Sequence, residues 1–422
     1  MSSTFITDIT TIPVAPLKIA ALESCTELAE MVDRHIFLQR RNHSSENSSE
    51  NSSENFSESS MKNFSSASSK RSSHNHSSIE FKGYKCNSYL LHCHCPRFGT
   101  GEAKGVMEES VRGADLFIMA DVGNYSLTYT AFGHENHMSP DNHFQDIKRI
   151  IAASSTAKRI NVIMPFMYEG RQHRRTKRES LDCALALQEL ADMGVQNIIT
   201  FDAHDPRVVN SIPINGFDNY MPPYQFIRTI LKVDKDLQID NDHMMIISPD
   251  EGGMNRAVYF SNVLGVDMGM FYKRRDYSTV INGKNPIVAH EFLGTDVAGK
   301  DVIIVDDMIA SGESVLDVAK KLKDRKAKKV FICTTFGLFT EGMEKFDEYY
   351  EKGYINYVIT TNLTYRKPEL LKKPYYLSAD MSKLIALIID TLNKDGSTEP
   401  VLSPTERIKT LVAQYYNKEK LH

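Results

Sequence analysis

Short apolar runs bounded by polar turns alternate along this chain with stretches in which apolar residues recur at helical spacing. The pattern predicts a strand followed by a helix within 17–38 and a strand within 84–91. Further strands are predicted at 116–120, 160–164, 198–201, 244–247, 266–272, 302–305 and 330–334. Strands that alternate with helices in this way are typical of an α/β fold in which helices flank parallel sheets.

The alternating elements fit two α/β lobes that meet near 211–219. We expect an N-terminal lobe at 14–212 and a C-terminal lobe at 213–393. The last predicted helix, 381–392, should pack back on the preceding elements, and 394–422 is expected to be a polar tail.

A low-complexity segment at 42–78 interrupts the N-terminal lobe, and Ser-Ser-Glu-Asn occurs there three times in succession between Ser44 and Asn55. Such a composition cannot bury enough apolar surface to offset the entropy lost on ordering. We therefore expect 42–78 to be a disordered insertion.

Composition describes a globular protein of two domains: 422 residues, of which 41% are hydrophobic and 25% charged. A net charge of −4 offers no general attraction for nucleic acid, and no apolar run approaches the ~20 residues that span a bilayer. The N-terminal residues lack the pattern of a signal peptide, and six cysteines in so long a chain do not suggest a disulfide framework. We expect a cytoplasmic protein with neither nucleic acid nor membrane among its partners.

The most informative motif is 302–314, where an apolar run leads to Asp306 and Asp307 and then to a turn of small residues that opens a helix. Open α/β sheets bind ligands at the carboxyl ends of their strands, and a helix N-terminus favours an anion such as phosphate. Gly312 permits the tight turn, while Ser311 and Ser314 offer hydroxyls. The motif indicates a site for a sugar phosphate; the alternative is an ordinary strand-turn-helix crossover with solvated acids.

Other strand ends also carry polar groups. Arg171–Arg178 is a dense basic run, which favours polyphosphate recognition over a solvated face or a nucleic-acid patch. Asp202 and His204 lie two apart after a strand, and Asp250 stands in a glycine-bearing turn. Lys273, Arg274 and Arg275 precede a polar stretch to about Pro286 that is typical of a mobile flap, where cations can stabilise a transferring phosphoryl group.

Together these motifs resemble those of the ribose-phosphate pyrophosphokinase family, which makes 5-phosphoribosyl 1-pyrophosphate (PRPP). The resemblance rests on residues 164–177, 202–204, 248–253, 273–275 and 302–314. Phe98 and Glu102 resemble a segment that reaches the adenine of a neighbouring subunit in the family. The chain departs from the family pattern at His173, Ala310 and Glu313, so contacts to the phosphates could differ in detail.

The resemblance implies two tandem type I phosphoribosyltransferase-like lobes that transfer pyrophosphate from ATP to ribose 5-phosphate, with Mg²⁺ as cofactor and a homo-oligomer as the assembly. It implies catalytic roles for Lys273 and Arg275 and ATP binding by Phe98, Glu102, Arg171, Gln172 and His204. Ribose 5-phosphate would be bound by Asp250, Asp306, Asp307, Ala310, Ser311, Gly312, Glu313 and Ser314. The metal would be held by Asp202, His204, Asp306 and Asp307.

Two other functions stay open on the motifs alone. The 302–314 motif also occurs in type I phosphoribosyltransferases, which consume PRPP, although these usually have one lobe and no need of the flap cations. A non-catalytic regulatory homologue is the second alternative, against which stands the presence of Lys273, Arg275, His204 and both acids.

Overall fold

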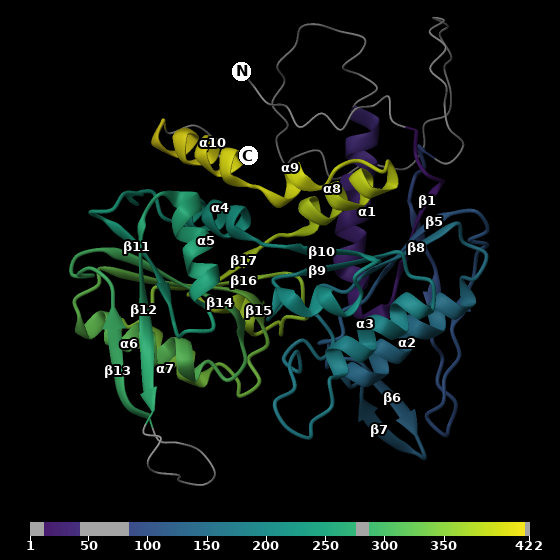
Figure 1. The fold of residues 1–422 in the computed structure, drawn as a ribbon, viewed down its shortest axis with the longest axis horizontal. Helices are drawn as coiled ribbons and strands as arrows, with labels where there is room; N and C mark the ends of the chain where they lie inside the picture. Colours follow the sequence, from purple (N-terminus) through teal and green to yellow (C-terminus); the bar gives the residue numbers. More distant parts are fainter. Residues whose placement is uncertain (1–11, 43–83, 276–286, 418–422) are drawn as a thin grey trace, which may run out of the picture.

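The computed structural model describes residues 12–42, 84–275 and 287–417, which form two α/β lobes side by side (Figure 1). The N-terminal lobe contains a parallel sheet with the strand order β10-β9-β8-β5-β1-β2. Its strands are β1 (Leu17–Ala21), β2 (Leu90–Leu91), β5 (Asp115–Met119), β8 (Arg159–Ile163), β9 (Asn197–Phe201) and β10 (Gly216–Tyr220). The central strands β5 and β8 are buried along their whole length, as expected for a parallel sheet covered on both faces.

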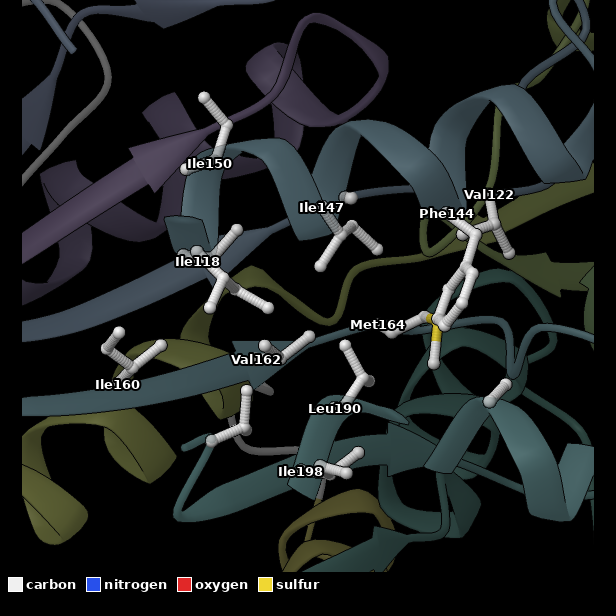
Figure 2. Packing of buried hydrophobic residues seen from close by; sticks show 14 of the residues in the cluster. Ile118, Val122, Phe144, Ile147, Ile150, Ile160, Val162, Met164, Leu190 and Ile198 are labelled. Carbon is white, nitrogen blue, oxygen red and sulfur yellow. The ribbon is translucent and has the colours of Figure 1, made fainter. Parts of the chain in front are cut away.

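Helices cover both faces of this sheet, because alternate residues of each strand face opposite ways. Ile118 of β5 packs in one core with α2 (Pro140–Ala153) and α3 (Asp182–Asp192), whereas Phe117 packs in another with α1 (Thr26–Asn42) and α8 (Ser382–Asn393). Figure 2 shows the first of these cores, in which Ile147 of α2 points toward Ile118 and Val162 of the sheet and Phe144 lies beside Met164.

The C-terminal lobe contains a seven-stranded sheet with the order β13-β12-β11-β14-β15-β16-β17, parallel except for the β12-β13 hairpin. Its strands are β11 (Met244–Ser248), β12 (Asp267–Arg275), β13 (Ile287–Leu293), β14 (Asp301–Ile309), β15 (Lys329–Gly337), β16 (Tyr357–Thr361) and β17 (Tyr376–Ala379). One face is covered by α6 (Glu313–Asp324) and α7 (Glu344–Glu351), and the other by α4 (Pro223–Val233), α5 (Met254–Leu264) and α10 (Thr405–Tyr416).

The remaining elements are short. Two antiparallel pairs, β3 (Cys93–His94) with β4 (Val106–Met107) and β6 (Thr128–Ala131) with β7 (His134–His137), belong to the N-terminal lobe. The short helices are η1 (Glu23–Cys25), η4 (Pro206–Ser211), η5 (Leu370–Lys372) and α9 (Glu399–Leu402). Among the helices that the structure describes, none has both the length and the apolar character needed to cross a bilayer.

The two sheets repeat one topology. Apart from β13, the order β12-β11-β14-β15-β16-β17 matches β2-β1-β5-β8-β9-β10 strand for strand. The predicted α/β fold, with two lobes in which helices flank parallel sheets, is confirmed. The repeat also makes the loops after β9 and β16 equivalent, and each of them contacts the opposite lobe: His204 reaches Asp307, and the Tyr365 N–H reaches Asp121.

The lobe boundaries differ from those expected. Because β10 pairs with β9, the N-terminal sheet extends to Tyr220 and not only to 212. The helix α8, expected in the C-terminal lobe, packs against α1 through a buried ion pair between Arg40 and Asp390. The segment at 394–422 is not simply a polar tail, since α10 buries Leu411 and Tyr415 against α4 and α5.

Two predicted segments fall where the structure gives no description. The insertion predicted at 42–78 lies outside the described residues apart from Asn42, the last residue of α1. The stretch 276–286, which belongs to the predicted flap, lies outside them as well.

Candidate active site between the lobes

A cleft of about 890 Å³ opens between the lobes at the carboxyl ends of β9, β11 and β14. This is the edge at which open α/β sheets bind ligands. Ten of the residues singled out in the sequence line it, namely Arg171, Asp202, His204, Asp250, Asp306, Asp307, Ala310, Ser311, Gly312 and Ser314.

The paired acids lie at the end of β14, which extends four residues beyond the predicted strand, to Ile309. Asp306 and Asp307 are adjacent and largely buried, and Asp306 Oδ1 accepts the Asp307 N–H at 2.9 Å. Burial and the charge of Asp307 raise the pKa of Asp306 well above its usual value. Burial would also raise the pKa of Asp307. The hydrogen bond from His204 and the positive charge of Arg256 outweigh this effect and hold the pKa of Asp307 below its usual value. The two acids therefore act as a coupled pair with unequal affinity for protons.

The small-residue turn after β14 leads directly into α6. Gly312 has φ +84°, and a Cβ at this position would lie 2.4 Å from the Phe346 ring, so the turn requires glycine. Ser314 and Val315, at the start of α6, line the cleft. A helix N-terminus at this position favours an anionic group.

The loop after β9 crosses from the N-terminal lobe into the cleft. His204 Nδ1 donates to Asp307 Oδ2 at 2.6 Å. This hydrogen bond raises the pKa of His204, although burial opposes the shift. Asp202 is 3% exposed, and its φ of +40° is a left-handed conformation that is strained for a non-glycine residue.

The Asp202 carboxylate is fully engaged inside the protein. Arg256 of α5 donates to it through Nε at 2.9 Å and through Nη2 at 2.7 Å. The Thr335 hydroxyl of β15 donates to Asp202 Oδ2 at 2.5 Å. Asp202 thus binds the guanidinium of Arg256 and the hydroxyl of Thr335, both of the C-terminal lobe. Its contact with Arg256 is an ion pair across the lobe boundary.

The turn after β11 holds Asp250 beside the acids of β14. Asp250 Oδ1 accepts the N–H of Gly252 at 2.9 Å and the N–H of Gly253 at 3.3 Å. A Cβ at Gly253 would lie 2.8 Å from Ser248 Oγ, so glycine allows the close turn. Asp250, which follows β11, and Asp306 and Asp307 of β14 therefore line the same cleft.

Comparison with known proteins agrees with this geometry. The sequence model of the N-terminal domain of ribose phosphate pyrophosphokinase matches residues 17–194, and that of the phosphoribosyl transferase domain matches 225–367. The ribose-phosphate pyrophosphokinase of Pasteurella multocida is 31% identical over 252 residues, which are 59% of this chain and 72% of that protein. The chain belongs to the ribose-phosphate pyrophosphokinase family.

A second similar sequence and a similar solved structure agree with this family assignment. The ribose-phosphate pyrophosphokinase of Mycoplasmopsis pulmonis is 30% identical over 301 residues, 70% of this chain and 84% of that protein. The crystal structure of phosphoribosylpyrophosphate synthetase from Mycobacterium smegmatis superposes with a TM-score of 0.66 at 20% identity, covering 90% of this chain and 99% of that one. At that identity the superposition shows the shared fold.

Several residues matched to family motifs lie away from this pyrophosphokinase cleft. Gln172 accepts the Asp182 N–H at 2.6 Å and donates to the Ser180 carbonyl, so it fixes the start of α3. Glu313 pairs with Lys345 at 2.9 Å. Phe98 and Glu102 stand at a turn outside the cleft, with Phe98 53% exposed.

For Lys273 and Arg275, the two cations of the family motif, the structure describes the backbone but not the side chains. Lys273 and Arg275 lie at the end of β12, where they pair with His290 and Ile287 of β13. Their side chains fall outside the described part of the chain. Because β12 is parallel to β11, its carboxyl end lies at the same edge of the sheet as Asp250.

Arg256 and Thr335 belong to the site but were not predicted. A signal for Arg256 existed, since it follows Gly253 by three residues at the start of a helix that opens on the cleft. No signal marked Thr335, which lies in the buried strand β15 and contacts Asp202 only because the lobes meet there.

The described residues at the cleft suit a divalent cation as partial ligands, together with substrate phosphates and water. In the described part of the chain, no group of three or more His, Cys, Asp and Glu side chains could hold a metal alone. Mg²⁺ usually binds through one or two carboxylates together with substrate phosphates and water, and Asp306 and Asp307 can supply such carboxylates. Asp202, predicted as a ligand, does not fit, because Arg256 and Thr335 occupy its carboxylate.

Proposed function

We propose that this chain transfers the pyrophosphoryl group of ATP to the anomeric hydroxyl of ribose 5-phosphate, which yields PRPP and AMP. The observation that carries the proposal is the cleft in which His204 of one lobe meets Asp307, Asp306 and the start of α6 of the other. Acids beside a helix N-terminus suit a sugar phosphate, whereas Arg171 and His204 suit a polyphosphate.

In the proposed reaction the anomeric oxygen forms a bond to the β-phosphorus of ATP as the bond from that phosphorus to the α-phosphate oxygen breaks. Asp306 and Asp307 accept hydrogen bonds from the ribose hydroxyls and orient the attacking oxygen. Residues Ala310, Ser311, Gly312 and Ser314, with the start of α6, hold the 5-phosphate. Mg²⁺, when bound, neutralises phosphate oxygens, and phosphoryl transfer relies chiefly on such positioning and charge.

At the donor end, Arg171 and His204 are proposed to position the ATP phosphates, and Lys273 and Arg275 to stabilise the charge of the transferring group. Asp250 is proposed to orient the sugar and the pyrophosphoryl group from the neighbouring strand end. Gln172 supports this end indirectly, through the backbone at the start of α3.

The decisive experiment is product analysis with ATP, ribose 5-phosphate and Mg²⁺. We expect AMP and PRPP in equal amounts. Formation of ADP in place of AMP, or formation of a nucleotide only when PRPP and a purine base are supplied, would contradict the proposal and favour another kinase or a phosphoribosyltransferase. No product from any combination would favour the regulatory homologue.

We also propose that the chain self-associates, because Phe98 and Glu102 present an exposed aromatic ring and an acid outside the chain's own cleft. Mixing Phe98→Ala with His204→Ala tests this: activity regained in the mixture means that the two residues act in one site from different subunits. The six free thiols support a reducing compartment, and we propose the cytoplasm.

A further inference from the structure

Arg256 is surrounded by carboxylates from both lobes. Its Nε and Nη2 bind Asp202 of the N-terminal lobe, and its Nη1 lies 3.7 Å from Asp306 Oδ1 of the C-terminal lobe. All three guanidinium nitrogens thus face an acid, and the side chain is only 10% exposed.

The stability of α5 does not explain this placement. Arg256 is in the first turn of the helix, where the macrodipole disfavours a cation, and that turn has no acidic residue of its own. Burying a guanidinium is also unfavourable unless it is paired and hydrogen bonded. The Asp202 backbone is strained at the same place, which indicates that the contact between the two side chains is what the surrounding structure maintains.

Charge compensation accounts for these features together. Asp202, Asp306 and Asp307 bring three carboxylates to the bottom of the cleft. His204 compensates Asp307, and Arg256 lies between Asp202 and Asp306. Without Arg256, Asp306 would keep its acidic neighbours Asp307 and Asp250 and would have no cation within ion-pair distance among the described residues.

We propose that Arg256 is a positioning residue for ribose 5-phosphate: held by Asp202, which is itself bound by the Thr335 hydroxyl, it fixes Asp306 in the orientation that receives the ribose hydroxyls. The inference rests on the proposed function. Asp202 then acts as the anchor of Arg256 and not as a ligand of the metal. Because Asp202 belongs to the other lobe, the orientation of the lobes and the geometry of the ribose site are linked through this one guanidinium.

The proposal predicts a selective defect, measured as the dissociation constants of ribose 5-phosphate and of ATP by titration calorimetry. Arg256→Lys keeps the charge but loses the planar fork that binds Asp202 at two points. We expect it to weaken ribose 5-phosphate binding by about tenfold or more and ATP binding by less than about twofold, since lysine cannot make both hydrogen bonds to the Asp202 carboxylate. Thr335→Val, which removes only the hydroxyl on Asp202, should give a smaller change of the same kind.

A double variant separates positioning from simple pairing. In Asp202→Asn with Arg256→Met the ion pair is removed from both sides, so a merely structural pair would leave ribose 5-phosphate binding near the parent level. We expect binding to stay weak, because Asp306 has lost its cation. Recovery in the double variant, or an equal loss for both substrates in Arg256→Lys, would overturn the proposal.

The control is Arg40→Lys, a change in another buried Arg–Asp pair, between α1 and α8 and away from the cleft. It should lower the melting temperature without changing the ratio of the two dissociation constants. Failure of the proposed function would look different, because the parent protein would then bind the substrates without forming AMP, or would bind neither.

Discussion

His204 Nδ1 and Asp307 Oδ2 lie 2.6 Å apart, so a histidine from the loop after β9 of one lobe donates a hydrogen bond to an acid of β14 in the other. The bond raises the pKa of His204, and Asp307 is held below its usual pKa against the effect of burial. Both shifts favour a charged imidazolium–carboxylate pair. The position of Asp307 therefore depends on a residue of the opposite lobe.

We expect His204→Ala to weaken ribose 5-phosphate binding about tenfold, because a hydrogen bond to a charged group contributes about 1.5–3 kcal/mol. Turnover should fall further, since the same side chain is proposed to position the ATP phosphates. Titration calorimetry and AMP formation measure the two effects. His243→Ala is the matched control, because His243 makes the same contact with Asp240, at 2.7 Å, on the surface. Equal behaviour of the two variants would contradict the role given to His204.

The repeat of the fold predicts a pH effect at the equivalent place in the N-terminal lobe. Asp121 follows β5 and accepts the N–H of Tyr365, which follows β16, at 2.8 Å. Burial raises the pKa of Asp121 to about 7, although this hydrogen bond and that from Gly123 oppose the shift. The folded state therefore keeps the Asp121 proton at pH values where the unfolded chain has lost it.

It follows that stability attributable to Asp121 falls as the pH rises from about 4 to about 7, by at most about 4 kcal/mol. Asp121→Asn removes this titration, so its free energy of unfolding should change less with pH over that range, although the loss of the Tyr365 hydrogen bond lowers stability overall. Denaturant unfolding at several pH values measures the slope. Asp296→Asn, an exposed acid that accepts a backbone N–H in the same way, should keep the parent slope. An unchanged slope in Asp121→Asn would refute the expectation.

Local pattern was sufficient to place most of the inner strands and the polar residues at their ends, but it did not mark β10, β16 or β17. The apolar run before Asp306 favoured a buried strand, and the parallel strands β11 and β14 share one edge of a sheet, so Asp250 and Asp306 were expected to be neighbours. Contacts between the lobes could not be predicted in this way. Asp202 was predicted as a metal ligand, and its carboxylate accepts hydrogen bonds from Arg256 and Thr335, which are distant from it in sequence.

The packing at the ends of the lobes depends on contacts of the same kind. Periodicity shows that α8 has an apolar face but not which lobe covers it, and the buried pair of Arg40 with Asp390 joins residues 350 positions apart. The helix α10 has a moderately polar sequence, and its few buried side chains, such as Tyr415, give no strong signal.

The cations at the end of β12 give a kinetic prediction. Lys273→Ala and Arg275→Ala should each lower turnover by about a hundredfold or more, the usual scale for removing one donor to a transition state. The melting temperature should change little. Steady-state AMP formation measures the effect, and Lys409→Ala, on the exposed surface of α10, is the control. Near-parent turnover in both variants would exclude the catalytic role.

Deleting 43–78 should leave folding and AMP formation nearly unchanged. Arg40 Nη1 donates to the Tyr84 carbonyl at 3.1 Å, so the chain on either side of the segment is held together by described residues. The remaining 79–83 can span up to about 18 Å, and shortening a loop lowers its closure entropy by only ~0.6 kcal/mol per halving. Thermal melting and activity of the deletion check this, and loss of soluble protein would mean that the segment contributes to the fold.

The double variant Asp306→Asn with Asp307→Asn tests the sugar end of the cleft. It keeps the shape of both side chains but removes two negative charges, so ribose hydroxyls and Mg²⁺ lose their anionic acceptors. We expect ribose 5-phosphate binding to fall by more than about tenfold while ATP still binds, because its phosphates are proposed to be held by Arg171 and His204. Titration calorimetry with each substrate alone separates the two, and Asp240→Asn with Asp242→Asn, two exposed acids of one turn, controls for the loss of charge. If the Asp306 and Asp307 variant bound ribose 5-phosphate as tightly as the parent, the acids at the end of β14 would not be its ligands.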